Sequence, residues 1–376
     1  MQIRTRTFAG LFALCATTCL SVAAHAAPRY AFEAIDSPDG LFPGSVYAFN
    51  NAGQVLGGFY TPSGDREVPR LYTPGVGYTD PTPPGASDVG AYGLNEAGQV
   101  VGRANGRAWQ FGAGGGGPVP GVSGDGSSAA AINDAGVVVG SHDVGGLPQA
   151  FVAVPGQAVR TVGSPYGGYA MDVNNRGEAL LGWVGGPIGP LFRYDIASGA
   201  LTQVGLDQEA GATVGRLNDR GEIAGQFGWK YDVHIHVYGP DGEHTRVPGL
   251  AGFSDESLYD MNNRGQVLGA AVNGGPGIPF ESRLFLYTPG EGSVALGPLL
   301  GDVPADWGYL NFGYLNDRGD ILGAGQHGSD WQLFMFRALA APVPEPGALV
   351  LLVAGLAGVG AAVRRPRGAQ PSAAAA

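Results

Sequence analysis

The sequence predicts an all-β protein, a seven-bladed β-propeller with four-stranded blades, and three observations predict it. The first is a repeat: the pattern Asn-x-x-Gly occurs seven times at intervals of 45, 38, 41, 44, 44 and 54 residues, which is the length of one propeller blade. The second is composition, because 67 glycines, 28 prolines and only 14% charged residues suit many short strands joined by tight turns. The third is that the repeat region begins with one extra strand and ends one strand short.

Each repeat is centred on a hairpin turn in which asparagine and glycine have a fixed spacing. Asparagine suits the first position of a type I turn because its side chain accepts a backbone hydrogen bond, and the glycine three residues later tolerates a positive φ. A second glycine four residues beyond the first indicates a place where another backbone approaches closely. The repeat-turn residues are Asn50, Gly53, Asn95, Gly98, Asn133, Gly136, Asn174, Gly177, Asn218, Gly221, Asn262, Gly265, Asn316 and Gly319.

Two further strands follow each hairpin. The third strand is rich in aromatic residues, as in residues 107–111 and 333–336, and a weaker fourth strand ends in glycine-rich turns, as in residues 200–204. Before the first hairpin the chain has one additional extended stretch, Tyr30 to Asp36, and after the third strand of the seventh repeat it turns to proline-rich sequence. We therefore expect Tyr30 to Asp36 to pair with Leu333 to Arg337, so that the ring closes without an exposed sheet edge.

The first 26 residues have the features of a secretory signal peptide. Arg4 and Arg6 precede an apolar run that ends in Ala24-His25-Ala26. Both cysteines, Cys15 and Cys19, lie in this segment, so cleavage after Ala26 leaves a protein without a disulfide, a cysteine nucleophile or a cysteine-zinc site. The net charge of −11, with a single lysine, leaves no basic stripe for nucleic acid.

The carboxyl end reads as a membrane anchor. Residues 339–346 form a proline-rich spacer, residues 347–363 carry no charge, and Arg364, Arg365 and Arg367 follow. Seventeen helical residues reach about 25 Å, at the short end of what spans a hydrocarbon layer of about 30 Å. The arginines would stay in the cytoplasm, which places the domain outside the inner membrane. The expected segments are thus a signal peptide (1–26), the propeller (27–338), the spacer (339–346), a transmembrane helix with its arginine stop (347–367) and a disordered tail (368–376).

This tail resembles the PEP-CTERM sorting signal of exported proteins in Gram-negative bacteria. The resemblance rests on Val343, Pro344, Glu345 and Pro346, on the apolar span and on Arg364 and Arg365. It implies an exosortase and the secretion machinery as partners, inner-membrane anchoring before processing, and a later place at the cell surface or outside the cell, often near exopolysaccharide. The alanine-rich extension from Gly368 to Ala376 departs from the pattern.

The repeats resemble the HAF family of extracellular repeats, whose units carry an Asn-x-x-Gly-x-Val-x-Gly hairpin followed by a His-Ala-Phe strand. The hairpin half is present in all seven copies, whereas the second half is reduced to residues such as Ala108, Ala150 and Phe151, with His234 at the histidine position. The family implies no established enzyme activity.

The sequence contains few candidate catalytic or metal-binding residues. His234 and His236 could present two imidazoles on one strand face with Asp232 or His244 nearby, but two strand histidines without a fixed third ligand hold zinc weakly, so we interpret them as structural. The Asn-Asp-Arg-Gly turns lack the several carboxylates of a calcium loop. Asp255, Glu256 and Asp260 could serve a glycosidase, although their spacing does not distinguish a catalytic pair. We expect no metal and no cofactor.

The leading expectation is a non-catalytic exported module that binds exopolysaccharide or mediates adhesion. Two alternatives stay open: an extracellular glycan hydrolase on a propeller scaffold, and a structural matrix protein without a specific ligand. Because a fold does not set a function, the repeats alone do not separate the three.

Overall fold

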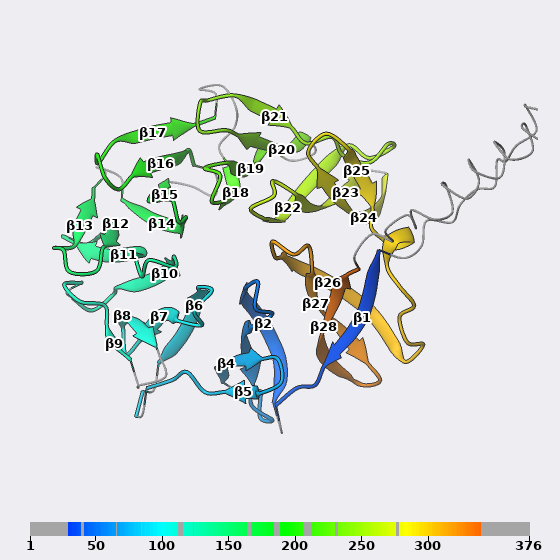
Figure 1. The fold of residues 1–376 in the computed structure, drawn as a ribbon, viewed down its shortest axis with the longest axis horizontal. Helices are drawn as coiled ribbons and strands as arrows, with labels where there is room; N and C mark the ends of the chain where they lie inside the picture. The colour runs from blue at the N-terminus through cyan, green and yellow to red at the C-terminus, as the bar shows by residue number, and fades with distance from the viewer. Residues whose placement is uncertain are drawn as a thin grey trace, which may run out of the picture. The chain divides into compact units, whose positions relative to one another are not determined.

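The described strands form seven sheets arranged as a ring (Figure 1). The computed structural model describes residues 29–339, apart from 39–40, 65, 84, 87, 112–115, 123, 164–166, 184–188, 206–211, 230–231 and 276–277. Each sheet has four strands, and every neighbouring pair is antiparallel. The predicted seven-bladed propeller is therefore confirmed.

The first three blades follow the chain from the innermost strand to the outermost. Blade 1 holds β2 (Phe42–Phe49), β3 (Val55–Tyr60), β4 (Glu67–Thr73) and β5 (Gly77–Thr79). Blade 2 holds β6 (Val89–Leu94), β7 (Val100–Ala104), β8 (Arg107–Phe111) and β9 (Gly117–Pro118). Blade 3 holds β10 (Ser128–Ile132), β11 (Val138–Val144), β12 (Leu147–Ala153) and β13 (Arg160–Val162).

Blades 4 to 6 repeat the same order. Blade 4 holds β14 (Gly168–Val173), β15 (Glu178–Trp183), β16 (Leu191–Asp195) and β17 (Leu201–Val204). Blade 5 holds β18 (Ala212–Leu217), β19 (Ile223–Trp229), β20 (Asp232–Tyr238) and β21 (His244–Arg246). Blade 6 holds β22 (Asp255–Met261), β23 (Val267–Gly275), β24 (Ile278–Thr288) and β25 (Gly292–Ala295), and the 3-10 helix η1 (Gly297–Leu299) follows it.

Blade 7 joins the two ends of the domain. It holds β26 (Trp307–Leu315), β27 (Ile321–His327), β28 (Asp330–Ala338) and, as its outer strand, β1 (Tyr30–Ile35). The register runs from Tyr30 opposite Ala338 to Ile35 opposite Leu333. The predicted closure by the first strand is thus confirmed. It covers the edge of β28, which would otherwise present unpaired backbone groups.

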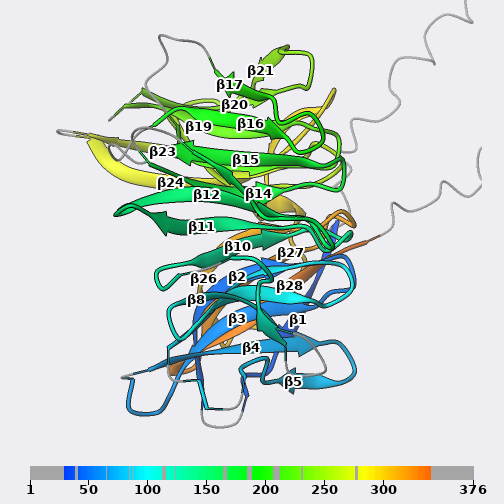
Figure 2. The same cartoon turned by 90° about the vertical axis from the view of Figure 1, so that its left-hand side faces the viewer.

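The ring has two faces, which we name by their turns. The Asn-turn face carries the seven hairpins between the first and second strands, and the opposite face carries the turns between the second and third strands and the connections between blades. Figure 2 shows the blades edge-on between these faces. Because Tyr30 pairs with Ala338 next to the Asn316 turn, the described chain enters and leaves at the Asn-turn face.

The core lies between neighbouring blades. One cluster joins Leu333 and Met335 of blade 7 to Val55 and Phe59 of blade 1. Of the largest fully buried side chains, Phe111, Phe151, Phe285, Phe334 and Phe336 all lie on third strands. Burial of each contributes about 1.5–3 kcal/mol, so the aromatic third strands predicted from the sequence provide much of the cohesion between blades.

At the second glycine of the repeat, the backbone of the neighbouring strand lies close to the glycine. The innermost strand of every blade has a register shift where it pairs with the second strand, for example between Ala129 and Ala131. Gly140 lies opposite this bulge, and a Cβ there would come within 2.0 Å of the Ser128 carbonyl oxygen. The expected close approach is confirmed at this position, and it excludes any side chain.

The predicted signal peptide (1–26), the spacer from residue 340 on, the transmembrane helix with its arginine stop (347–367) and the tail (368–376) lie outside the described residues. Within the part of the chain that the structure describes, no helix is long and apolar enough to cross a membrane.

Candidate functional site

The repeat asparagines form the inner wall of the Asn-turn face. In blade 4 the Asn174 Oδ1 accepts the backbone N–H of Arg176 at 3.1 Å and of Glu178 at 2.9 Å. Gly177 has φ 84° and donates its N–H to the Asn174 carbonyl. All seven asparagines are buried, with 2–6% exposure. In blade 4 the asparagine and the glycine therefore both stabilise the turn, and the asparagine side chain accepts the bond from two residues on in four of the seven blades.

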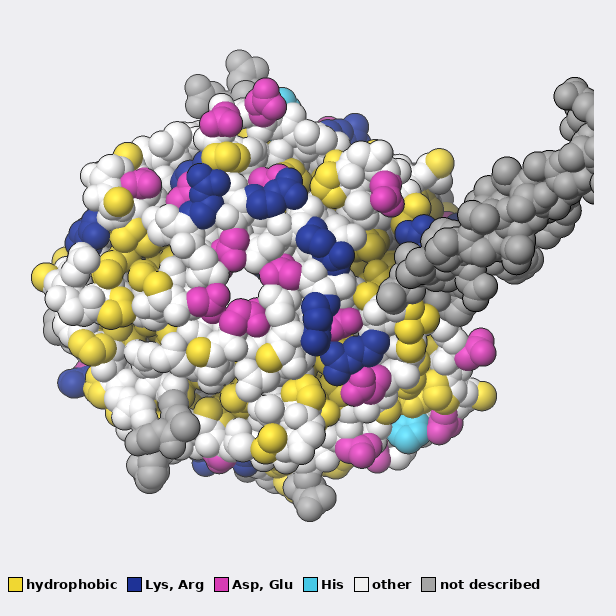
Figure 3. Space-filling model, viewed as in Figure 1, with side chains coloured by type: hydrophobic (Ala, Val, Ile, Leu, Met, Phe, Trp, Pro, Cys, Tyr) yellow, Lys and Arg dark blue, Asp and Glu magenta, His cyan; other side chains and the backbone are white. Residues whose placement is uncertain are grey.

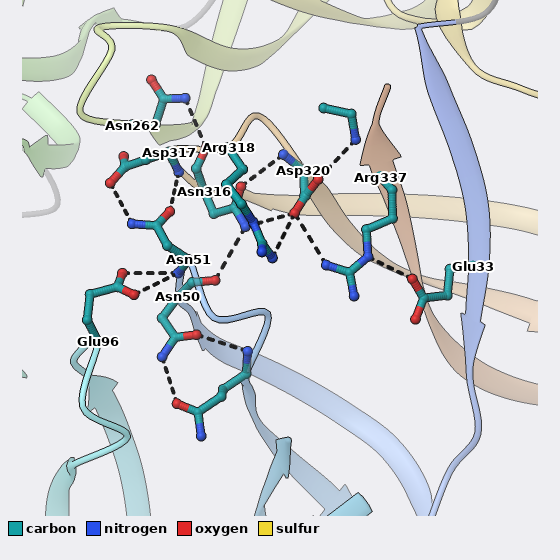
Figure 4. Close-up of polar contacts among 12 residues, drawn as sticks. Glu33, Asn50, Asn51, Glu96, Asn262, Asn316, Asp317, Arg318, Asp320 and Arg337 are labelled. Atoms are coloured by element: carbon teal, nitrogen blue, oxygen red, sulfur yellow. Dashed lines mark hydrogen bonds and ion pairs between the residues drawn. The ribbon is translucent and has the colours of Figure 1, made fainter. Parts of the chain in front are cut away.

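Each asparagine also binds the next blade. The Asn174 Nδ2 donates to the carbonyl oxygen of Asn218 at 2.9 Å, and the same bond recurs from Asn50 to Asn95, Asn95 to Asn133, Asn133 to Asn174, Asn218 to Asn262, Asn262 to Asn316 and Asn316 to Asn50. The last bond joins residues 266 positions apart and closes the ring (Figure 4). Seven local turns thereby become one continuous structure.

A second closed ring uses the residue after each asparagine. Its backbone N–H donates to a side-chain oxygen of the same position in the next blade, through Asn51, Glu96, Asp134, Asn175, Asp219, Asn263 and Asp317. Two side-chain amides bridge carboxylates: Asn263 Nδ2 contacts Asp219 and Asp317 at 2.9 Å each, and Asn175 Nδ2 contacts Asp134 and Asp219. We name these seven residues the pore ring. Alternating amides and carboxylates keeps most like charges apart.

The rings surround a central pore. A cavity of about 280 Å³ is lined by the pore ring, six of the seven repeat asparagines, Asp172 and Asp260. Figure 3 shows acidic side chains around the central opening. Asp172 accepts the N–H of Val173 and of Leu217, and Asp260 is paired with Arg216 at 3.3 Å. The pore is therefore acidic but internally hydrogen-bonded.

Three pore carboxyls bind protons more tightly than usual. Burial raises the pKa of Asp172 to about 6 and also raises the pKa of Asp260. Burial, and to a smaller extent the charges of Asp134 and Asp317, raises the pKa of Glu96. Desolvation disfavours the charged form of each group, so each of these carboxyls keeps its proton to a higher pH than an exposed carboxyl does.

Arginines outside the pore ring neutralise neighbouring carboxylates. Four consecutive blades place arginine two residues after the asparagine, at Arg176, Arg220, Arg264 and Arg318, whereas blades 1 to 3 have Ala52, Ala97 and Ala135. Arg220 contacts Glu222 at 2.5 Å, and Arg318 contacts Asp320 at 3.2 Å. Arg176 also pairs with Glu178 at 3.8 Å, so three of the four arginines are paired with a carboxylate of their own turn. Figure 3 shows basic side chains beside acidic ones on this face.

The histidines examined as a metal site belong to two separate clusters. His234 lies between Glu256, 2.7 Å from Nδ1, and Asp232, 2.9 Å from Nε2. His236 instead stacks with His244 at 5.7 Å. Among the described residues no group of three or more His, Cys, Asp or Glu is arranged to hold a metal ion. The two imidazoles therefore contact different partners, although they share one strand.

The three carboxylates considered for a glycosidase do not converge. Asp255 and Glu256 lie at the opposite-face end of β22, where Asp255 pairs with Val272, while Asp260 lies five residues along the strand beside the pore. Five residues of strand span about 17 Å, which exceeds the separation of about 5–9.5 Å that glycosidase carboxyls require. Asp260 is therefore no partner for the other two.

The opposite face is apolar by comparison. Six aromatic side chains of the described residues are 40–78% exposed, namely Phe42, Tyr60, Tyr169, Phe280, Tyr309 and Trp331. Each lies at the end of its strand away from the Asn turns. No aromatic side chain of the described residues is equally exposed on the Asn-turn face.

Sequence reasoning missed both the pore ring and this aromatic face. A signal for the ring is present, because the residue after each repeat asparagine is Asn, Asp or Glu in all seven copies. The aromatic face has no such signal, since its residues occupy different positions in different repeats.

Comparison with known proteins identifies the tail. The PEP-CTERM protein-sorting motif matches residues 342–365, which include the predicted Val343, Pro344, Glu345, Pro346, Arg364 and Arg365. These residues lie outside the described part of the chain. No curated protein matches the chain.

Solved structures share the fold at low identity. An oligogalacturonate lyase in complex with manganese has 12% identity and a TM-score of 0.54, covering 82% of this chain and 93% of that one. Virginiamycin B lyase from Staphylococcus aureus has 11% identity and a TM-score of 0.48, covering 82% and 98%. The tricorn protease has 13% identity and a TM-score of 0.45 over 77% of this chain, which spans only 32% of that protein.

The likeness to the oligogalacturonate lyase, at a TM-score of 0.54, supports a common fold, and an identity of 12% says nothing about activity. The chain is a seven-bladed β-propeller with a PEP-CTERM motif, which marks it as an exported protein that an exosortase sorts to the cell surface.

Proposed function

We propose that this protein is a non-catalytic polysaccharide-binding module of the cell surface or extracellular matrix, built from HAF-type repeats. The observation that carries the proposal is the segregation of exposed aromatic side chains to the opposite face. Contiguous or clustered exposed apolar groups mark interaction sites. Aromatic rings with polar neighbours suit sugars, whose C–H faces are apolar and whose edges carry hydroxyls.

The attachment of the tail supports this assignment of faces. The described chain ends beside the Asn turns, so the residues that follow Ala338 are attached at the Asn-turn face. The opposite face carries neither end of the described chain. We propose that the span of residues 347–363 holds the protein in the inner membrane before processing, and that exopolysaccharide is the partner of the aromatic face.

The net charge of the protein limits the class of polysaccharide that it can bind. A protein with net charge −11 repels polymers rich in uronate, sulfate or phosphate, and complementary charge normally sets partner choice. Neutral or amino sugars therefore fit better than acidic ones.

The test is affinity electrophoresis of the purified exported protein through gels that contain a neutral β-glucan, a β-mannan, chitosan or polygalacturonate. We expect retardation by at least one neutral or amino polymer and no release of reducing sugar. Sugar release abolished by a single carboxylate substitution would favour the hydrolase. Absence of binding to every polymer would leave the structural matrix role.

A further inference from the structure

In blade 7 two strands reach further toward the opposite face than their equivalents in blade 2. β26 and β28 are nine residues long, whereas the equivalent strands β6 and β8 have six and five. β26 and β6 both end at the Asn ring, so the additional residues of β26 lie at the opposite face. β28 begins two residues further toward that face than β8 does, because Phe336 and Phe111 occupy the same register position, opposite Ile321 and Val100. Tyr309 and Trp331 lie on these extensions.

A β-bulge sets the direction of the Tyr309 side chain. Trp307 pairs with His327 and Leu310 with Gly325, so Gly308 and Tyr309 together oppose the single residue Gln326. Such a bulge re-aims the side chain of the extra residue. This shift is additional to the one that blade 7 shares with the other blades between Phe312 and Tyr314, and Tyr309 is 68% exposed.

Trp331 completes a row across three strands. It pairs with Gln326 across β27 and β28, and its ring centroid lies 6.0 Å from that of Tyr309 at 71°. Side chains two residues apart in a strand share a face, so Trp331 points to the same side as Leu333 and Met335, which pack against blade 1. The row Tyr309, Gln326 and Trp331 therefore lies at the rim of the boundary between blades 7 and 1.

The strands that carry the row are packed on their other face, the one that holds Phe334. Trp307 is 9% exposed, stacks on His327 at 5.1 Å and 19°, and packs edge-on against Phe334. His327 in turn contacts Asp306 at 2.8 Å. A pre-formed support reduces the entropy lost on binding, which favours recognition by a few fixed side chains.

We infer that this row is a sugar-binding subsite for a neutral polysaccharide, with a pyranose ring stacked on Trp331, a second contact on Tyr309, and the Gln326 amide bonded to a hydroxyl. The inference rests on the proposed function and names its site. The nearby exposed carboxylates, Asp306 and Asp330, disfavour an acidic polymer by like-charge repulsion. The exposed Gln326 supplies both a donor and an acceptor for hydroxyls.

The test compares Trp331→Ala and Tyr309→Ala with Val76→Ala and Leu201→Ala, which remove exposed apolar side chains at the Asn-turn face of other blades. The probes are a soluble neutral β-glucan and a β-mannan, with polygalacturonate as the acidic comparison, and dissociation constants come from isothermal titration of the full protein. We expect Trp331→Ala to weaken binding at least tenfold and Tyr309→Ala less. The two control variants should bind like the wild type, and thermal melts of all four should be unchanged.

The outcomes separate the subsite from the general function. Wild-type binding that survives both blade 7 substitutions overturns the subsite and keeps the polysaccharide-binding function. A wild type that binds none of the polymers overturns both. Equal losses in the control variants, or preference for polygalacturonate, also overturn the subsite. Conversion of a dimer to a monomer by Trp331→Ala, seen by sedimentation, would assign the row to self-association instead.

Discussion

At the Asn-turn face all seven blades present the same turn, whereas the connections between blades at the opposite face vary in length. The turns from Asn50 to Gln54 and from Asn316 to Asp320 have the same backbone bonds. The connections of the opposite face range from the five residues 163–167 to the eleven residues 296–306. The first face is polar and hydrogen-bonded across blades through its buried asparagines; the second exposes aromatic rings.

This difference shows how a repeat separates stability from recognition. The repeated face closes the ring through side-chain amides, so every copy must keep the same residue. The variable face contributes little to closure, so its residues are available for a ligand. We therefore expect changes at the Asn-turn face to lower the unfolding free energy strongly and substitutions at the opposite face to alter it little.

The largest expected effect is at the closing strand. Deletion of residues 30–36 removes β1, uncovers the edge of β28 and exposes the side chains that pack on Tyr30 and Ile35, which are 5% and 1% exposed. We expect the unfolding free energy to fall by about 5 kcal/mol or more, with a sharply lower melting temperature in calorimetry. Phe280→Ala at the opposite face is the control and should melt like the wild type. A deletion variant with an unchanged melt would contradict closure by β1.

The second largest loss of stability is expected from substitution of a single repeat asparagine. Asn174→Ala removes two bonds within the turn and two from Nδ2, to the Asn218 carbonyl and to Glu178. Because buried partners are left unpaired, we expect a loss of about 2–4 kcal/mol, measured from the urea midpoint at unchanged slope. Gln326→Ala removes an exposed amide from the opposite face and should change stability by less than about 0.5 kcal/mol. Similar losses of unfolding free energy in both variants would contradict this difference between the two faces.

The smallest effect concerns pH. The pKa of Asp172 is raised to about 6 in the folded protein, so the folded state binds this proton more tightly than the unfolded chain. The resulting stability is fully present below the ordinary aspartate pKa of about 4 and is lost progressively as the pH rises from there through about 6. We expect the unfolding free energy at pH 5 to exceed that at pH 7.5 by about 1 kcal/mol from this group, with raised pKa values of Asp260 and Glu96 acting in the same direction.

Urea midpoints between pH 5 and 7.5 measure this dependence. Asp172→Asn should flatten it, whereas Asp330→Asn at the exposed end of blade 7 should leave it as in the wild type. An Asp172→Asn variant with the wild-type pH dependence would show that the buried carboxyl does not titrate in this range.

Much of the fold follows from local chemistry and was therefore predictable. Asn174 with Gly177 makes the same turn wherever it occurs, and the extra strand at Tyr30 matches the missing strand after Ala338 by simple counting. The candidate sites were less predictable, because Asp255 and Asp260 are neighbours in sequence and yet about 17 Å apart along an extended strand, and because the partners of His234 come from β22 and from its own strand.

By itself the sequence determined the number of blades, the turn between their first two strands and the closure by β1, because each depends on residues close together or on a regular count. Only the tertiary structure decided which groups meet. The bond from Asn316 to Asn50 spans 266 residues, the pore ring takes one residue from each blade, and the row on blade 7 depends on a bulge. Contacts of this kind arise from how separate sheets are placed around an axis, which no short stretch of sequence encodes.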